Sequence, residues 1–267
     1  GAEPKPIQWV NDVNDETPPP FLFVRRCIDV DVAPDTLGRP ARACCSARFR
    51  VPAQRPQQSQ HDRYMDGCSD RSHSWSGGGH KPENFVECSW PCTAAGSCQP
   101  HCSRRSQQRG VSHLLQVFYT ANKGWCLRTR SFIAAGEFIM EYAAERVSSE
   151  RGCERVLINP DTETYMMDVT PPTGRAEGSD RTSAMLDALA VRNHAAFAAF
   201  ACNKKLANMT MERLHTHHWD HRYPHTGFYA KRDIQPNEEL TYMREGTHVK
   251  GSQFNCQCGR EECTGML

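Results

Sequence analysis

Cysteines are the residues of this 267-residue chain that point most directly to chemistry, because it contains 14 of them. A first group lies before position 103 and comprises Cys44, Cys45, Cys68, Cys88, Cys92, Cys98 and Cys102. A second group comprises Cys256, Cys258 and Cys263. Thiolates at short intervals suit tetrahedral zinc, whereas disulfides need an oxidising compartment, for which nothing in the sequence argues. The spacing therefore favours zinc.

The second group offers three thiolates within eight residues, one fewer than a closed structural zinc site needs. A fourth ligand must come from elsewhere in the chain, and the isolated Cys202 is the candidate. A lone cysteine is ordinarily a small buried apolar residue. The incomplete trio nevertheless favours Cys202 as a ligand.

The first group contains two pairs with three intervening residues, Cys88 with Cys92 and Cys98 with Cys102. The surrounding stretch, 41–110, is rich in Cys, Ser, Gly, Gln and Arg and has hardly an apolar run, so it cannot build its own hydrophobic core. Metal is the natural source of order here. By contrast, we interpret the histidines of HTHHWDHRYPH as surface residues of a polar hairpin, namely His215, His217, His218 and His221.

The chain from Val111 onward is expected to consist mostly of strands, because short apolar or alternating runs separated by Gly, Asn or Pro dominate there. The runs are HLLQVFYT, GWCLRT, EFIMEYAAERV, TGFYAKRDI and EELTYM. The Ala-rich stretch 183–202 predicts the one clear helix, broken near Asn193. The first forty residues predict an extended arm, and TPPTGRAEGSDRTS predicts a surface loop.

Composition excludes two classes of function. The chain is 38% hydrophobic with a mean hydropathy of -0.67, and no window approaches the ~18 apolar residues of a membrane span. Lys and Arg number 32 against 31 Asp and Glu, a net charge of +1, so there is no global basic field to drive strong direct nucleic-acid binding.

Read in order, a series of segments resembles the pre-SET, SET and post-SET modules of histone lysine methyltransferases, most closely the group that methylates lysine nine of histone H3. The segments are VECSWPC, CQPHCSRR, NKGWCLRT, EFIMEYAAE, LDALAVRNHAAFAAFAC, AKRDIQPNEELTYM and FNCQCGREEC. The resemblance covers nearly the whole chain, including the VNDVNDETPPP arm.

The resemblance implies a mainly β fold with short helices, in which small curved β-sheets surround a pseudoknot-like C-terminal segment. It divides the chain into an arm (1–40), a pre-SET module (41–110), a SET domain (111–250) and a post-SET tail (251–267). The family's pre-SET module holds three zinc ions with nine cysteines. This chain has seven there, which implies fewer ions or histidine substitutes such as His61 or His73. The implied post-SET ligands are Cys202, Cys256, Cys258 and Cys263.

The implied reaction is transfer of a methyl group from S-adenosylmethionine to a lysine nitrogen, an in-line displacement that needs a narrow channel. The resemblance assigns Tyr142 and Tyr165 to the channel, and Tyr242 to the aromatic position that influences how many methyl groups fit. The implied donor-binding residues are Lys123, Gly124, Trp125, Tyr165, Ala199, Phe200 and Phe254. Outside the family, such strand tyrosines are ordinarily packing residues.

Two motif positions depart from the family. Ala199 and Phe200 stand where relatives have Asn-His, and Arg244 stands where they have the catalytic tyrosine. Arg244 could instead be a solvated charge at a strand end. The chain is thus expected to be a nuclear, chromatin-bound methyltransferase acting on the histone H3 tail. The alternative is an inactive SET pseudo-methyltransferase that binds histone tails or chromatin-associated proteins as a scaffold.

Overall fold

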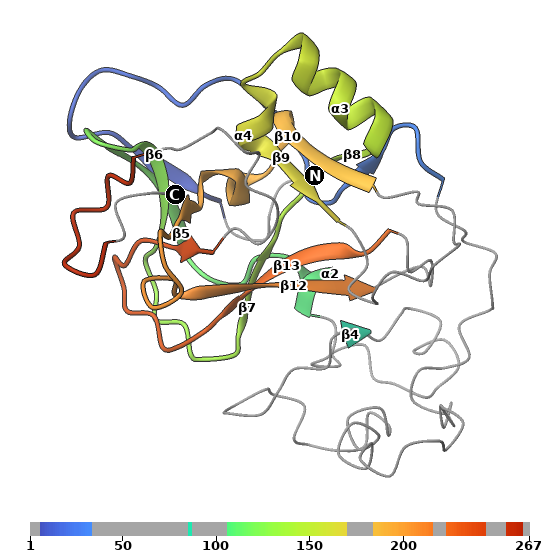
Figure 1. Ribbon diagram of the computed structural model, residues 1–267. Helices are drawn as coiled ribbons and strands as arrows, with labels where there is room; N and C mark the ends of the chain where they lie inside the picture. The colour runs from blue at the N-terminus through green and yellow to red at the C-terminus, as the bar shows by residue number, and fades with distance from the viewer. Residues whose placement is uncertain are drawn as a thin grey trace, which may run out of the picture.

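The computed structural model describes residues 6–33, 85–86, 106–169, 184–215, 223–243 and 255–263. Within these ranges the chain is mainly β, with short helices, and its strands form three small sheets (Figure 1), as expected from the sequence. The predicted loop at 170–183 lies outside the described residues. So do the seven cysteines of the first group, His61, His73, Arg244 and Phe254.

The first sheet joins the arm to the start of the predicted SET region. It consists of β1 (Gln8–Val10), β5 (Leu115–Thr120) and β6 (Gly124–Thr129) in the order β1-β5-β6. β5 and β6 form an antiparallel hairpin at the positions that the sequence predicted, and β1 adds in parallel along β5. Gly124 begins β6 with φ of 70°, a left-handed conformation that favours glycine.

The second sheet overturns the helix prediction for 183–202. It consists of β2 (Leu22–Phe23), β10 (Ala184–Arg192), β8 (Ala144–Ser148) and β3 (Ile28–Asp29), with β9 (Met166–Asp168) also paired to β10. The Ala-rich residues form this central strand, followed by the 3-10 turn η3 (His194–Phe197) and the short strand β11 (Ala199–Phe200). Pairing with β2, β8 and β9 overrides the helix propensity of alanine, which is a weak preference.

The third sheet carries three of the sequence-predicted site residues, Ala199, Phe200 and Tyr242. Its order is β11-β14-β12-β13-β7, with β14 at Thr241–Tyr242, β12 at Met209–His215, β13 at His225–Ala230 and β7 at Phe138–Glu141; β4 (Phe85–Val86) pairs with β12. β12 and β13 form the predicted antiparallel hairpin. Side chains from all three sheets meet in one hydrophobic core, whose fully buried members include Leu127, Ile139, Leu186 and Phe228.

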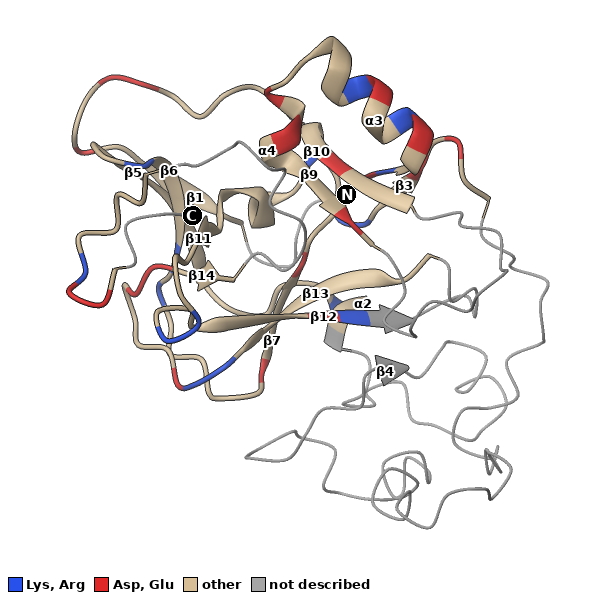
Figure 2. Cartoon of the chain, viewed as in Figure 1, with Lys and Arg blue, Asp and Glu red and all other residues tan. Residues whose placement is uncertain are grey.

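Sequence reasoning missed the longest described helix, α3 (Ser149–Ile158), which crosses the outside of the second sheet (Figure 1); α2 (Ser106–Arg109) and α4 (Thr162–Tyr165) are single turns. Ser148 caps α3 by accepting a hydrogen bond from the backbone N–H of Arg151 at 3.3 Å. The signal was the serine cap before SERGCERVLI, whose exposed charges alternate in sign along the helix (Figure 2). No helix in the described ranges is long and apolar enough to span a bilayer.

We expect Gly152→Val to destabilise the protein by about 1–3 kcal/mol, the usual cost of overpacking. A Cβ on Gly152 would lie 2.4 Å from Met185 Sδ and 3.3 Å from Met185 Cβ, so the Met185 side chain of β10 would have to repack to make room for valine. Urea unfolding measures the loss. Cys153→Val, which adds a β-branched residue at the exposed neighbouring position, is the matched control and should change stability far less. Equal effects would contradict the packing argument.

Candidate functional site

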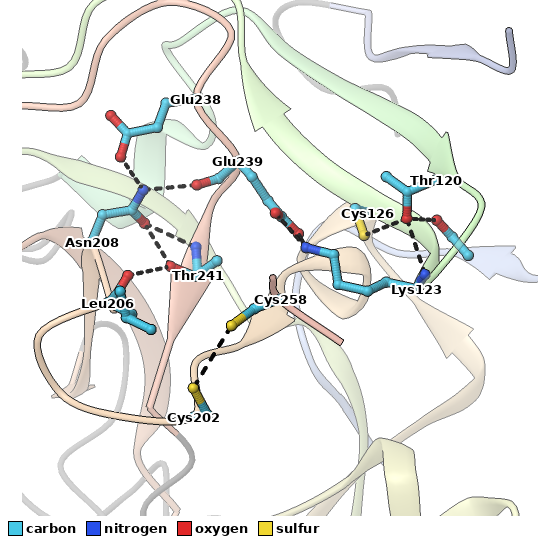
Figure 3. A network of polar contacts seen from close by, with 11 residues as sticks. Thr120, Lys123, Cys126, Cys202, Leu206, Asn208, Glu238, Glu239, Thr241 and Cys258 are labelled. Carbon is cyan, nitrogen blue, oxygen red and sulfur yellow. Dashed lines mark hydrogen bonds and ion pairs between the residues drawn. The ribbon is translucent and has the colours of Figure 1, made fainter. Parts of the chain in front are cut away.

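The four cysteines proposed as one zinc site come together in the structure. Their sulfur atoms all lie within 4.8 Å of one another. Cys202 Sγ is 3.9 Å from Cys258 Sγ (Figure 3). It is 3.7 Å from Cys263 Sγ. Tetrahedral zinc with Zn–S bonds of ~2.3 Å separates its sulfur ligands by about 3.8 Å. The cluster therefore has the dimensions of a closed four-thiolate zinc site.

The tail around these thiols has no apolar core of its own. In residues 255–263 the three cysteines are partly buried and every other residue is exposed. Desolvation raises the pKa of Cys256 to about 12, and hydrogen bonds with the other three thiols add to that rise. A cation would remove this penalty on the thiolates. One further described link to the core is the hydrogen bond that Asn203 Nδ2 donates to the carbonyl oxygen of Glu262, at 2.6 Å.

A polar network beside the cluster fixes the segment before β14 (Figure 3). Asn208 donates to the Glu238 carboxylate at 2.9 Å and to the Glu239 carbonyl at 2.7 Å, and it accepts from the N–H of Thr241 at 2.9 Å. Lys123, predicted to bind the donor, forms an ion pair with Glu239. Sequence reasoning missed Asn208 because a lone asparagine at a strand start carries no spacing signal.

The donor-binding tryptophan predicted from the sequence lies in a row of three aromatic rings. Trp125, next to Gly124 in β6, makes edge-to-face contact with Tyr119 at a centroid distance of 5.2 Å. It makes a second such contact with Trp9 of β1 at 5.7 Å. Trp9 itself remains 52% exposed. The arm therefore reaches the predicted donor site directly.

The predicted channel residues also share one cluster. Tyr142 packs edge-to-face on Phe228 at a centroid distance of 6.2 Å, and Phe228 packs on Tyr242 at 4.7 Å. The Tyr142 hydroxyl donates a hydrogen bond to the carbonyl oxygen of Tyr165 at 3.2 Å. Phe228, buried in β13, was not predicted as a site residue, and its place in an alternating apolar run resembles any core position.

The altered Asn-His position lies against this cluster. β11 runs parallel to β14, with Ala199 opposite Thr241 and Phe200 opposite Tyr242. The rings of Phe200 and Tyr242 are in edge-to-face contact at 5.2 Å. An apolar methyl and a phenyl ring thus occupy the two places where the resemblance expects hydrogen-bonding side chains.

Comparisons with known proteins agree with this geometry. The SET domain family model matches residues 124–243. The H3 lysine-9 specific histone-lysine N-methyltransferase SUVH6 of Arabidopsis thaliana is 26% identical over 304 residues, covering 100% of this chain and 35% of the relative. A crystal structure of SUVH6 in complex with SAM has a TM-score of 0.75 at 25% identity, covering 100% of this chain and 54% of that one.

A further relative carries a different description. The probable inactive histone-lysine N-methyltransferase SUVR2 of Arabidopsis thaliana is 25% identical over 311 residues, covering 98% of this chain and 42% of the relative. The chain therefore spans between a third and a half of the length of these two relatives.

Proposed function

Because residues 124–243 match the SET domain family model, we propose that the chain uses S-adenosylmethionine to methylate a lysine in the histone H3 tail. The observation that carries the proposal is the joint cluster of Tyr142, Phe228 and Tyr242, with the Tyr142 hydroxyl on the Tyr165 carbonyl. A lysine side chain placed against this ring cluster would lie in apolar surroundings, which favour the neutral amine over the charged ammonium.

Some of the residues around the aromatic cluster suit the binding of S-adenosylmethionine. Lys123, Gly124, Trp125, Tyr165 and Phe254 are the residues proposed to hold S-adenosylmethionine. The donor supplies a methyl group on a positively charged sulfur. Tyr142 donates its hydroxyl hydrogen to the carbonyl of Tyr165, and a hydroxyl oxygen can in addition accept from the N–H groups of an incoming amine. Ala199 and Phe200 contribute packing but no hydrogen bond to the donor.

Zinc at Cys202, Cys256, Cys258 and Cys263 is part of the same proposal. Zinc would bind the four thiolates and so fix the tail next to β11 and the aromatic cluster. Domain boundaries at 40, 110 and 250 and a pre-SET zinc module on the first cysteine group complete the proposed organisation. A nuclear location and chromatin-associated partners follow from a histone substrate.

We expect Trp9→Ala to weaken S-adenosylmethionine binding roughly two- to tenfold, since an aromatic pair contributes about 0.5–1.5 kcal/mol and Trp9 contacts Trp125. Calorimetric titration measures the change. Val13→Ala, at an arm residue with a similar exposure of 54%, is the matched control and should bind as the unmodified protein does. Trp9→Phe should restore most of the affinity. A loss shared by both alanine variants would show a general effect of the arm instead.

A second candidate function is a catalytically inactive histone-tail or chromatin scaffold. It is favoured by the packing of Phe200 on Tyr242, which puts an apolar ring at the expected histidine position, and by Arg244 in place of the catalytic tyrosine. Both candidates use the same fold and the same zinc site. They differ in whether methyl transfer takes place.

Transfer of labelled methyl from S-adenosylmethionine to a histone H3 tail peptide distinguishes the two. An active enzyme labels the peptide, and a peptide in which arginine replaces the target lysine stays unlabelled. Tyr142→Phe should lower this transfer without unfolding the protein, because it removes only the hydroxyl that contacts Tyr165. A folded protein that binds the peptide but transfers no methyl group would establish the scaffold.

A further inference from the structure

A second cluster of metal-ligating side chains lies where the arm meets the third sheet. Cys27 comes directly before β3, Glu141 ends β7, and His225 begins β13. One ligand atom from each of the three residues lies within 4.8 Å of the other two. None of them belongs to the cysteine cluster of the tail or to the predicted donor site.

The distances suit a small tetrahedral ion. Cys27 Sγ is 3.7 Å from Glu141 Oε1, and His225 Nδ1 is 2.8 Å from the same oxygen. With Zn–S bonds of ~2.3 Å and Zn–N and Zn–O bonds of ~2.0–2.1 Å, the corresponding separations in a zinc site are about 3.5 Å and about 3.3 Å. The separation of Cys27 Sγ from Glu141 Oε1 therefore already fits, whereas His225 Nδ1 needs to move away from Glu141 Oε1 by about half an ångström.

Burial and charge at the cluster also suit a divalent cation. Glu141 is 5% exposed and His225 is 2% exposed. Burial alone would raise the pKa of Glu141, but the charge and hydrogen bond of His225 hold that pKa below its usual range, so the carboxylate stays ionised. Burial, followed by the charge of Glu141, raises the pKa of Cys27 to about 12, so the thiol keeps its proton when no metal is bound.

The other charged groups near the cluster are arginines. Arg146, fully buried, faces Cys27 and pairs with Asp29 at 3.1 Å, and Arg26 acts on Glu141 from the arm. One thiolate and one carboxylate carry two negative charges, which a divalent ion balances. The metal and its ligands together therefore carry no net charge beside these arginines. The positive charge of Arg146 favours the thiolate form of Cys27, which is the form that binds metal.

We propose that Cys27, Glu141 and His225 bind a divalent transition metal of the zinc class and thereby fasten the N-terminal arm to β7 and β13. On binding, the ion displaces two protons to solvent, namely the thiol proton of Cys27 and the Nδ1 proton through which the charged His225 bonds to Glu141. His225 then presents its Nδ1 lone pair and keeps its proton on Nε2. No atom changes its oxidation state. The site is independent of methyl transfer.

Metal content of the full chain tests the proposal. After zinc loading and removal of excess, elemental analysis of Cys27→Ser should show one equivalent less zinc per chain than the unmodified protein. Cys153→Ser, at an exposed cysteine outside both clusters, is the matched control and should lose none. Cys258→Ser should lose the tail zinc, and the double variant Cys27→Ser/Cys258→Ser should lose both. A folded Cys27→Ser protein with unchanged zinc content would overturn the site.

Protection of the thiol in the unmodified chain gives a second test that needs no variant to fold. Zinc should slow alkylation of Cys27, mapped by mass spectrometry of the peptides, at least tenfold. The exposed Cys153 should react equally fast with and without zinc. Equal alkylation of Cys27 in both conditions would overturn the proposal. Because this readout concerns the arm alone, it is separate from the outcome of any donor or transfer assay.

Discussion

Cys258→Ser is expected to leave the three sheets folded while freeing residues 255–263 and weakening S-adenosylmethionine binding at least tenfold. Apart from the hydrogen bond between Asn203 and Glu262, the described tail is held by its partly buried cysteines, so most of its folding free energy is the free energy of metal binding. Structural zinc supplies about 10–16 kcal/mol in small zinc peptides, and three thiolates leave the coordination shell open. Limited proteolysis followed by mass spectrometry locates the freed segment.

Chelation of the unmodified protein should free residues 255–263 as well, in addition to removing metal from the other proposed sites. Cys153→Ser, which removes an exposed thiol on α3, should do neither. The melting transition of the core should persist in Cys258→Ser, because the hydrophobic core that contains Leu127, Ile139 and Phe228 includes no residue of 255–263. Unchanged donor affinity in a variant whose tail is protease-sensitive would remove the tail from the donor site.

Restoring the family residues at the altered positions should raise methyl transfer to a histone H3 peptide at least a thousandfold. The triple variant is Ala199→Asn, Phe200→His and Arg244→Tyr. A hydrogen-bonded group left unpaired in a buried site costs about 1–3 kcal/mol. A guanidinium ~4 Å from the donor sulfonium costs about 4 kcal/mol at an effective dielectric constant near 20, which by itself corresponds to about a thousandfold in rate.

The double variant Ala199→Asn/Phe200→His isolates the contribution of β11, where Phe200 packs on Tyr242. Arg151→Tyr, an arginine-to-tyrosine change at an exposed position of α3, controls for the loss of positive charge and should leave transfer unchanged. If the triple variant folds, binds the donor and transfers no faster than the unmodified chain, the altered positions do not limit the reaction.

Sequence patterns predicted the parts of the fold in which local signals agree with tertiary pairing. The hairpin of β5 and β6 was found because apolar alternation, aromatic residues and a glycine turn all favour strands. The strand β10 was missed because its alanines favour a helix locally, while its pairing partners are distant in sequence. The helix α3 was missed because its apolar residues are few and its charges dominate.

The same division holds for the site. The grouping of Cys202 with the tail thiols was predictable because zinc chemistry demands a fourth ligand whatever the intervening chain does. The cluster of Cys27, Glu141 and His225 was not predictable, because its members are 84 or more positions apart and the sequence around each one shows no metal-binding pattern. His225 ends the histidine-rich run that suggested a polar surface, yet pairing of β13 buries it.

Calorimetric titration of the zinc-loaded full chain with S-adenosylmethionine shows whether the donor site exists before any substrate or rate is considered. We expect saturable binding of one donor per chain, which is lost in Trp125→Ala, weakened by Trp9→Ala and unaffected by Val13→Ala. Absence of binding in a protein that is folded and holds zinc at Cys202, Cys256, Cys258 and Cys263 would contradict this expectation.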